Sequence, residues 1–159
     1  MTIDIFTFLD NLAQERYRAA IIHTRPDNSP ALSQFSQKFC QIRKGKHLDL
    51  LNHFIQSPNL SETIDCFGPA KFREFLKEQS QSCSLLVIDR ADFLLDTWRT
   101  TERQDFYRFV QNQWDGYKEG MKACLVFCLQ TSLEMEPLKI FDTQGQSRIH
   151  QLSDFHDIA

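Results

Sequence analysis

The sequence predicts an α/β protein built around a mostly parallel sheet. Short apolar runs alternate with segments whose apolar residues recur every three or four positions, as in amphipathic helices. One apolar run, residues 84–89, ends at Asp89, and a continuous run of this kind is typical of a strand buried on both faces, as in parallel sheets. Ligands of open parallel sheets bind outside the carboxyl ends of the strands, so Asp89 stands where a ligand would lie.

The expected elements follow one another in the order of a three-layer α/β/α domain. Strands are predicted within residues 17–24, 84–89 and 122–130, with a short edge strand within 41–46. Helices are predicted within residues 2–16, from Ser29-Pro30 through Phe39, through residues 48–55, up to residue 79, as a short turn within 91–98, and over 101–116. Two short strands, residues 138–141 and 147–152, flank a turn at residues 143–145 and predict a C-terminal β-hairpin.

Length and composition indicate one globular domain over residues 1–159. The chain is 42% hydrophobic and 25% charged, and no apolar segment approaches the roughly 20 residues that span a bilayer. The first ten residues lack the basic start and apolar block of a signal peptide, so we expect a cytoplasmic protein.

The five cysteines show no CxxC pair or zinc-like spacing, which favours buried thiols. A net charge of -3 argues against a surface that grips nucleic acid everywhere.

The segment after the first strand has the frame of a phosphate-binding loop but not its residues. A strand, a short polar turn and a helix beginning at Ser29 follow one another. A Walker A loop needs glycines, a Lys and a Ser or Thr around the phosphates. Between His23 and Leu32 there is no Gly and no Lys, and Pro26 and Pro30 each remove a backbone donor.

The segment LLVIDRADFLL resembles the Walker B strand and following turn of AAA+-type P-loop NTPases. The resemblance extends to the order of the later elements, and Gln130-Thr131 falls where that family has its sensor residue. In size and layout the chain is also similar to the small P-loop protein of bacteriophage-exclusion defence systems. The resemblance implies a degenerate P-loop NTPase domain that lacks Walker A.

Within that resemblance, Asp89 takes the place of the magnesium-organising acid, and Arg90 replaces the Glu that orients the attacking water. A cation cannot serve as that base, so we expect no ATP hydrolysis, no catalytic residue, no cofactor and no metal site. A vestigial nucleotide or metal site is predicted at Asp89, Arg90, Asp92, Thr131, Arg25 and Ser29. The alternative is that Asp89 is structural, capping a helix or pairing with an arginine.

Aromatic residues beside arginines suggest an interaction surface, because such residues are favoured anchors at protein interfaces. The candidates are Trp98, Arg99, Arg103, Tyr107 and Trp114. The same grouping could stack on single-stranded nucleic acid, and the plainer alternative is ordinary core packing with solvated charges.

Three functions remain open from the sequence. The first is a catalytically inactive P-loop-like domain that acts as a binding or regulatory subunit of a larger assembly, in phage defence or nucleic-acid processing, with protein partners. The second is a divergent NTPase that binds nucleotide through a non-standard loop. The third is a nucleic-acid-binding module that uses Arg43, Lys44, Lys46 and the arginine-rich helix.

Overall fold

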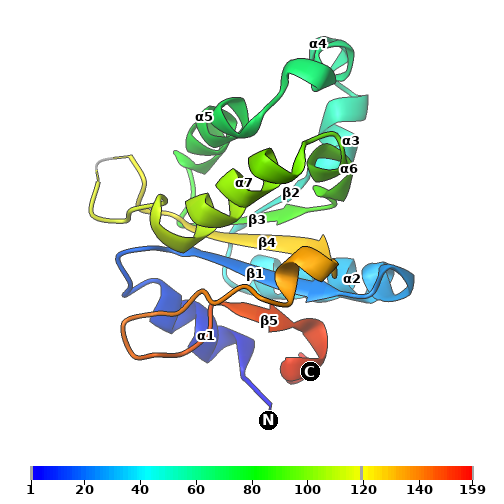
Figure 1. The fold of residues 1–159 in the computed structure, drawn as a ribbon. Helices are drawn as coiled ribbons and strands as arrows, with labels where there is room; N and C mark the ends of the chain where they lie inside the picture. Colours follow the sequence, from blue (N-terminus) through cyan, green and yellow to red (C-terminus); the bar gives the residue numbers. More distant parts are fainter. Residues whose placement is uncertain (1, 119, 159) are drawn as a thin grey trace.

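The computed structural model describes residues 2–118 and 120–158 and contains a five-stranded sheet with the order β2-β3-β4-β1-β5 (Figure 1). The strands are β1 (Ala19–Thr24), β2 (Lys46–Asp49), β3 (Leu85–Asp89), β4 (Cys124–Gln130) and β5 (Ile149–Gln151). Every neighbouring pair is parallel, so the predicted α/β class is confirmed and the sheet is entirely rather than mostly parallel.

Helices cover both faces of this sheet, as the α/β/α prediction requires. They are α1 (Ile5–Leu12), α2 (Ser29–Ile42), α3 (Leu50–Ile55), α4 (Pro58–Glu62), α5 (Pro69–Ser80), α6 (Asp92–Asp96) and α7 (Thr100–Asn112), with short 3-10 turns η1 (Pro26–Asn28), η2 (Ile64–Cys66), η3 (Leu133–Met135) and η4 (Leu152–Asp154). Side chains of α1 and α2 pack on one face, and those of α3, α5, α6 and α7 pack on the other. In the described residues we find no helix with both the length and the apolarity to cross a membrane.

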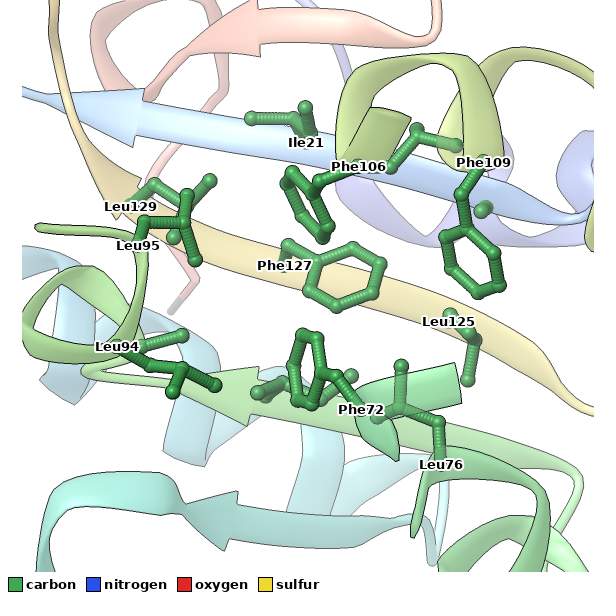
Figure 2. Packing of buried hydrophobic residues seen from close by; sticks show 14 of the residues in the cluster. Ile21, Phe72, Leu76, Leu94, Leu95, Phe106, Phe109, Leu125, Phe127 and Leu129 are labelled. Atoms are coloured by element: carbon green, nitrogen blue, oxygen red, sulfur yellow. The ribbon is translucent and has the colours of Figure 1, made fainter. Parts of the chain in front are cut away.

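Aromatic residues fill the face covered by α5 and α7. Phe127 of β4 lies at the centre, with Phe106 and Phe72 packed against its ring (Figure 2). The ring centroids of Phe106 and Phe127 are 5.0 Å apart in an edge-to-face arrangement, which is a favoured geometry for aromatic pairs. This aromatic core fixes the two helices against the sheet and so sets the position of the strand ends.

A second hydrophobic cluster fills the opposite face, between the sheet and the helices α1 and α2. Cys124 and Cys128 of β4 pack there with Cys40 of α2, and burial raises the pKa of both Cys40 and Cys124 to about 11. Burial also raises the pKa of Cys128, so all three thiols are protonated and unreactive near neutral pH. All five cysteines are free, but Cys66 is exposed and Cys83 half-buried, so the expectation of buried thiols fails for these two.

The predicted C-terminal hairpin is reduced to one isolated antiparallel bridge between Phe141 and Ser147. The turn is present: the Asp142 side chain accepts hydrogen bonds from two following backbone N–H groups, and Gly145 adopts a φ of 78°. The second strand, however, leaves its partner and pairs in parallel with β1 as β5. The hairpin is therefore present only as a short turn, whose arms are joined by backbone hydrogen bonds from Asp142 to Gln146 and from Arg148 to Ile140, because residues 149–151 pair with β1 instead.

Arg148 anchors the start of β5 from the interior. Its guanidinium donates hydrogen bonds to the carbonyl oxygens of Ala19 at 2.8 Å, Val110 at 3.0 Å, Gln111 at 2.6 Å and Phe141 at 3.2 Å. Two of these carbonyls belong to the last turn of α7, where backbone acceptors lack helical partners. One side chain thereby ties α7, β1 and the C-terminal segment together.

All five strands end at the same edge of the sheet, called here the carboxyl edge. Its last strand residues are Thr24, Asp49, Asp89, Gln130 and Gln151. The register places Asp49 beside Asp89 and Thr24 beside Gln130. Two carboxylates therefore sit next to each other at the ends of β2 and β3.

Candidate functional site at the carboxyl edge

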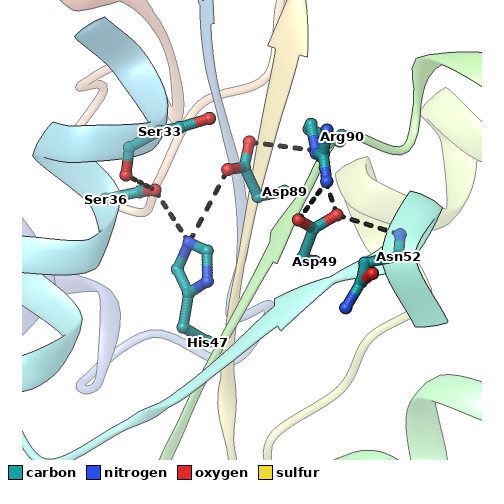
Figure 3. Close-up of polar contacts among 7 residues, drawn as sticks. All are labelled: Ser33, Ser36, His47, Asp49, Asn52, Asp89 and Arg90. Atoms are coloured by element: carbon teal, nitrogen blue, oxygen red, sulfur yellow. Dashed lines mark hydrogen bonds and ion pairs between the residues drawn. The ribbon is translucent and has the colours of Figure 1, made fainter. Parts of the chain in front are cut away.

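Asp89, which closes β3, is buried and held by neighbouring groups (Figure 3). One carboxylate oxygen accepts a hydrogen bond of 2.9 Å from the backbone N–H of Arg90. The other lies 3.7 Å from Nε2 of His47 on β2. The sequence placed an acid at this strand end correctly, and the structure surrounds it with polar partners.

His47 links Asp89 to helix α2. Its Nε2 lies 3.0 Å from the hydroxyl of Ser36, and that hydroxyl donates to the carbonyl oxygen of Ser33 at 2.9 Å. The hydroxyl therefore accepts from Nε2–H, the same N–H that is near Asp89. Burial lowers the pKa of His47 more than the nearby Asp89 and Asp49 raise it. The ring is thus neutral at neutral pH and acts as a hydrogen-bond donor.

Arg90 turns away from Asp89 toward Asp49. Its backbone has a φ of 55°, an uncommon left-handed conformation for a residue with a side chain. The guanidinium donates hydrogen bonds to both carboxylate oxygens of Asp49, from Nε to Oδ1 at 2.9 Å and from Nη2 to Oδ2. Burial alone would raise the pKa of Asp49. Its hydrogen bonds with Arg90 and with the backbone N–H of Asn52 outweigh burial and lower that pKa. The Asn52 bond makes Asp49 the N-cap of α3. The positive charge of Arg90 is therefore already paired.

Asp92 begins α6 and joins it to the end of β4. Its Oδ1 accepts a hydrogen bond of 2.8 Å from the backbone N–H of Gln130, and the Gln130 side chain donates to the Ser29 hydroxyl at 3.3 Å. Burial raises the pKa of Asp92. Asp92 thus has a structural role of the kind considered for Asp89, because it accepts a hydrogen bond from the backbone N–H of the last residue of β4.

Four of the six predicted site residues line one cavity of about 270 Å³ at the carboxyl edge: Ser29, Asp89, Arg90 and Asp92. The remaining two line a neighbouring cavity of about 760 Å³ between β1 and β5. Arg25 is exposed there, and its Nε lies 3.7 Å from a carboxylate oxygen of Asp27. The hydroxyl of Thr131 lies 2.7 Å from Nδ1 of His23. The topology therefore brings all six residues to one edge of the sheet, where they line adjoining cavities, and Asp92 and Thr131 also line a third cavity of about 280 Å³ together.

The predicted interaction surface is wrong for its aromatic members. The exposed fractions of Trp98, Tyr107 and Trp114 are 5%, 6% and 0%. Both indole N–H groups donate to buried backbone carbonyls, of Phe67 and Ala123, each at 2.8 Å. Tyr107 lies on the buried face of α7, and Trp98 and Trp114 lie just before and just after that helix, so all three rings pack into the same hydrophobic core.

The arginines of that predicted surface are divided. Arg99 is exposed and supplies the N-cap position of α7, where its backbone N–H donates to Glu102 at 3.1 Å. Arg103 pairs with Glu134 at 2.6 Å and donates to the carbonyl oxygen of Leu95 at 3.4 Å. With the rings buried, these two charges do not form a stacking platform.

The basic run proposed for nucleic acid lies at the other end of the sheet. Arg43 pairs with Asp10 at 2.7 Å, and the Lys46 ammonium donates to the Gln79 side chain at 2.6 Å. Lys46 begins β2, so this run is at the amino ends of the strands, away from the carboxyl edge. The side chains of Arg43 and Lys46 therefore already have partners within the protein.

Asp49 and His47 are site residues that the sequence reasoning missed. Both lie on β2, which the sequence placed a few residues too early, within 41–46 rather than at Lys46–Asp49. An acid followed by Leu50 and Leu51 at the start of a helical pattern is an N-cap signal and could have found Asp49. No local signal pairs Asp49 with Arg90, which lies 41 residues away.

Comparison of the chain with protein-family models, with curated proteins and with solved structures gives no match. Among the described residues, no three or more His, Cys, Asp or Glu side chains are grouped to hold a metal ion.

Proposed function

We propose that this chain is a P-loop-like domain that works as a binding or regulatory subunit and does not hydrolyse nucleoside triphosphates. The observation that carries the proposal is the pair between Arg90 and Asp49. In the resemblance to AAA+-type NTPases, Arg90 occupies the position of the water-orienting Glu. Here that position carries a cation, and the cation forms an ion pair with Asp49 at the end of the neighbouring strand β2.

The charges around the cavity also disfavour a bound triphosphate. Asp89, Asp92 and Asp96 line it, while the charge of Arg90 is neutralised by Asp49. Phosphoryl transfer relies on cations and backbone donors placed around the phosphates. Pro26 in the turn between β1 and α2, and Pro30 in the first turn of α2, have no backbone N–H to donate. The carboxylates of this cavity would therefore repel an anionic ligand.

One observation favours a second candidate function, magnesium-dependent nucleotide binding. Ser29 of α2 lines the same cavity as Asp89 and Asp92, although about 60 residues separate it from them in the chain. A hydroxyl and two carboxylates are oxygen ligands of the kind that Mg²⁺ takes, and a metal would offset their negative charge.

The test is a calorimetric and thermal-shift titration of the full chain with ATP, ADP and GTP at millimolar concentration, with and without Mg²⁺. A ligand that binds only the folded state raises the melting temperature. We expect no heat and no shift. A magnesium-dependent shift that disappears in Asp89→Asn would overturn the proposal in favour of the second function, and phosphate release would then be assayed.

The proposed setting is the cytoplasm, where thiols such as the five free cysteines stay reduced. The proposed partners are proteins of a larger assembly. We propose phage defence or nucleic-acid processing as the biological setting, because the sequence resembles P-loop proteins of such systems.

A further inference from the structure

The segments that precede β1 and β4 lie side by side at the edge of the sheet opposite the carboxyl edge, called here the amino edge (Figure 1). An antiparallel bridge joins Tyr17 to Asp115, and the Arg18 guanidinium donates to the carbonyl oxygen of Lys122 at 3.1 Å. These contacts bring basic and aromatic side chains of the two segments together. The resulting amino-edge patch consists of Arg16, Tyr17, Arg18, Tyr117, Lys118 and Lys122.

Two tyrosines of this patch share one arginine. The Arg16 guanidinium lies over both rings, with its Cζ 5.3 Å from the ring centroid of Tyr17 and 5.7 Å from that of Tyr117. Such cation–π contacts attract the cation to the face of the ring. Tyr117 is nevertheless 70% exposed, so much of its ring is open to solvent. An exposed ring held by a neighbouring cation offers a surface on which a planar base can stack.

Positive charge in the patch is not cancelled by its acids. Carboxylates next to the patch already have partners: Asp115 pairs with Arg16 at 2.9 Å, and Glu15 accepts a hydrogen bond from the Thr143 hydroxyl at 2.7 Å. The patch cations that form no ion pair among the described residues are Arg18, Lys118 and Lys122. These charges are free to attract phosphate groups.

The basic run of residues 43–46 extends the positive charge along the same edge. Lys46 begins β2, and Lys44 before it is exposed and forms no ion pair in the part of the chain that the structure describes. In the sheet, β3 and β4 separate β2 from β1, so Lys46 and the patch are roughly 14 Å apart at about 4.8 Å per strand. An extended nucleic-acid strand that contacts the patch can therefore also reach this run.

We propose that the amino-edge patch binds single-stranded nucleic acid, with a base stacked on Tyr117 and phosphates beside Lys118 and Lys122. Aromatic faces beside unpaired cations are the combination that single-strand binding uses. An acidic protein segment would pair with the cations but would make no use of the open ring face, so the exposed tyrosine favours nucleic acid. This inference goes beyond the proposed function and concerns the opposite edge of the sheet, so neither depends on the other.

The probe is a fluorescein-labelled oligothymidylate, titrated against the full chain by fluorescence anisotropy at several salt concentrations. Lys118→Gln with Lys122→Gln should weaken binding about tenfold at low salt. It should also make the slope of log K against log salt shallower by about 1.4, since each single-strand phosphate contact contributes about 0.7. The matched control is Lys71→Gln with Arg99→Gln, which removes the same charge from exposed residues outside the patch and should change neither quantity.

A second pair of variants tests stacking. Tyr117→Ala should bind about tenfold more weakly, whereas Tyr117→Phe keeps the ring face and should bind like the unchanged protein. Equal losses in the two double variants, full affinity in Tyr117→Ala, or tighter binding of a polyglutamate peptide than of the oligonucleotide would each overturn the inference. The nucleotide titration at the carboxyl edge has a separate outcome, so failure of this inference is distinguishable from failure of the proposed function.

Discussion

Arg90 and Arg148 each join distant segments of the sheet, but they do so in different surroundings. The Arg90 side chain is 48% exposed at the carboxyl edge and binds a carboxylate, Asp49. Arg148 is only 3% exposed and donates to carbonyl oxygens alone. Burial lowers the pKa of the Arg148 guanidinium, yet the acceptors around it keep it in place.

The difference teaches which arginine supports the fold and which shapes the site. An exposed ion pair contributes little stability because water and salt screen it. A buried cation with several acceptors is costly to remove, since it leaves unpaired polar groups in the interior. Arg148 is therefore expected to dominate stability, and Arg90 to affect the charge of the cavity beside Asp89. Three predictions, on Arg148, on Asp49 and on Arg90 with Lys44, test this contrast, and one on pH tests the buried histidines.

Arg148→Met should lower the free energy of unfolding by about 3–5 kcal/mol, because the carbonyl oxygens of α7 and β1 lose their donors inside the protein. Arg148→Lys keeps the charge but reaches fewer carbonyls, so it should lose less. Urea unfolding followed by circular dichroism measures both. A loss below about 1 kcal/mol for the methionine variant would show that water replaces the guanidinium.

Asp49→Asn should lower the free energy of unfolding by only about 0.5–1 kcal/mol, because the lost pair with Arg90 is partly exposed and the new amide oxygen still caps α3. Asp49→Ala also removes the cap and should cost about 1 kcal/mol more. The same urea experiment compares the two variants. If they were equally stable, Asp49 would not act as a cap.

Stability should fall as the pH drops below about 6.5, the ordinary pKa of histidine. The pKa values of His47 and His23 are lowered in the folded state by burial, so the unfolded chain binds more protons in this range, and stability rises with pH. His47→Gln keeps a donor for Ser36 and should flatten the slope without abolishing it, because His23 still titrates. Thermal melts from pH 7.5 to 5.5 provide the measurement, and an unchanged slope would contradict the assignment to His47.

Lys44 and Arg90 have the same backbone φ of 55°, and glycine adopts this conformation without a side-chain penalty. Lys44→Gly should raise the free energy of unfolding by up to about 1 kcal/mol, since Lys44 is exposed and has no ion pair among the described residues. Arg90→Gly gains the same relief but loses the Asp49 pair, so its net change should be smaller. A calorimetric melt of each variant provides the measurement, and a gain for Arg90→Gly equal to or larger than that for Lys44→Gly would mean that the Asp49 pair adds no stability.

The sequence by itself determined the α/β class, the central strand and the acid at its end. Residues 84–89 were placed almost correctly, and β3 is Leu85–Asp89, because a strand buried on both faces requires a continuous apolar run. The absence of glycine and lysine after β1 could also be read directly, since a phosphate loop depends on residue types within one short segment.

Only the tertiary structure decided which groups meet. The register that sets Asp49 beside Asp89, the turn of Arg90 toward Asp49, and the bonds of Arg148 to a carbonyl 129 residues away all join segments that are distant in the chain. Burial of Trp98 and Trp114 likewise depends on the sheet and helices that surround them. Periodicity records which face of an element is apolar, whereas the partner across that face is chosen by packing of the whole chain.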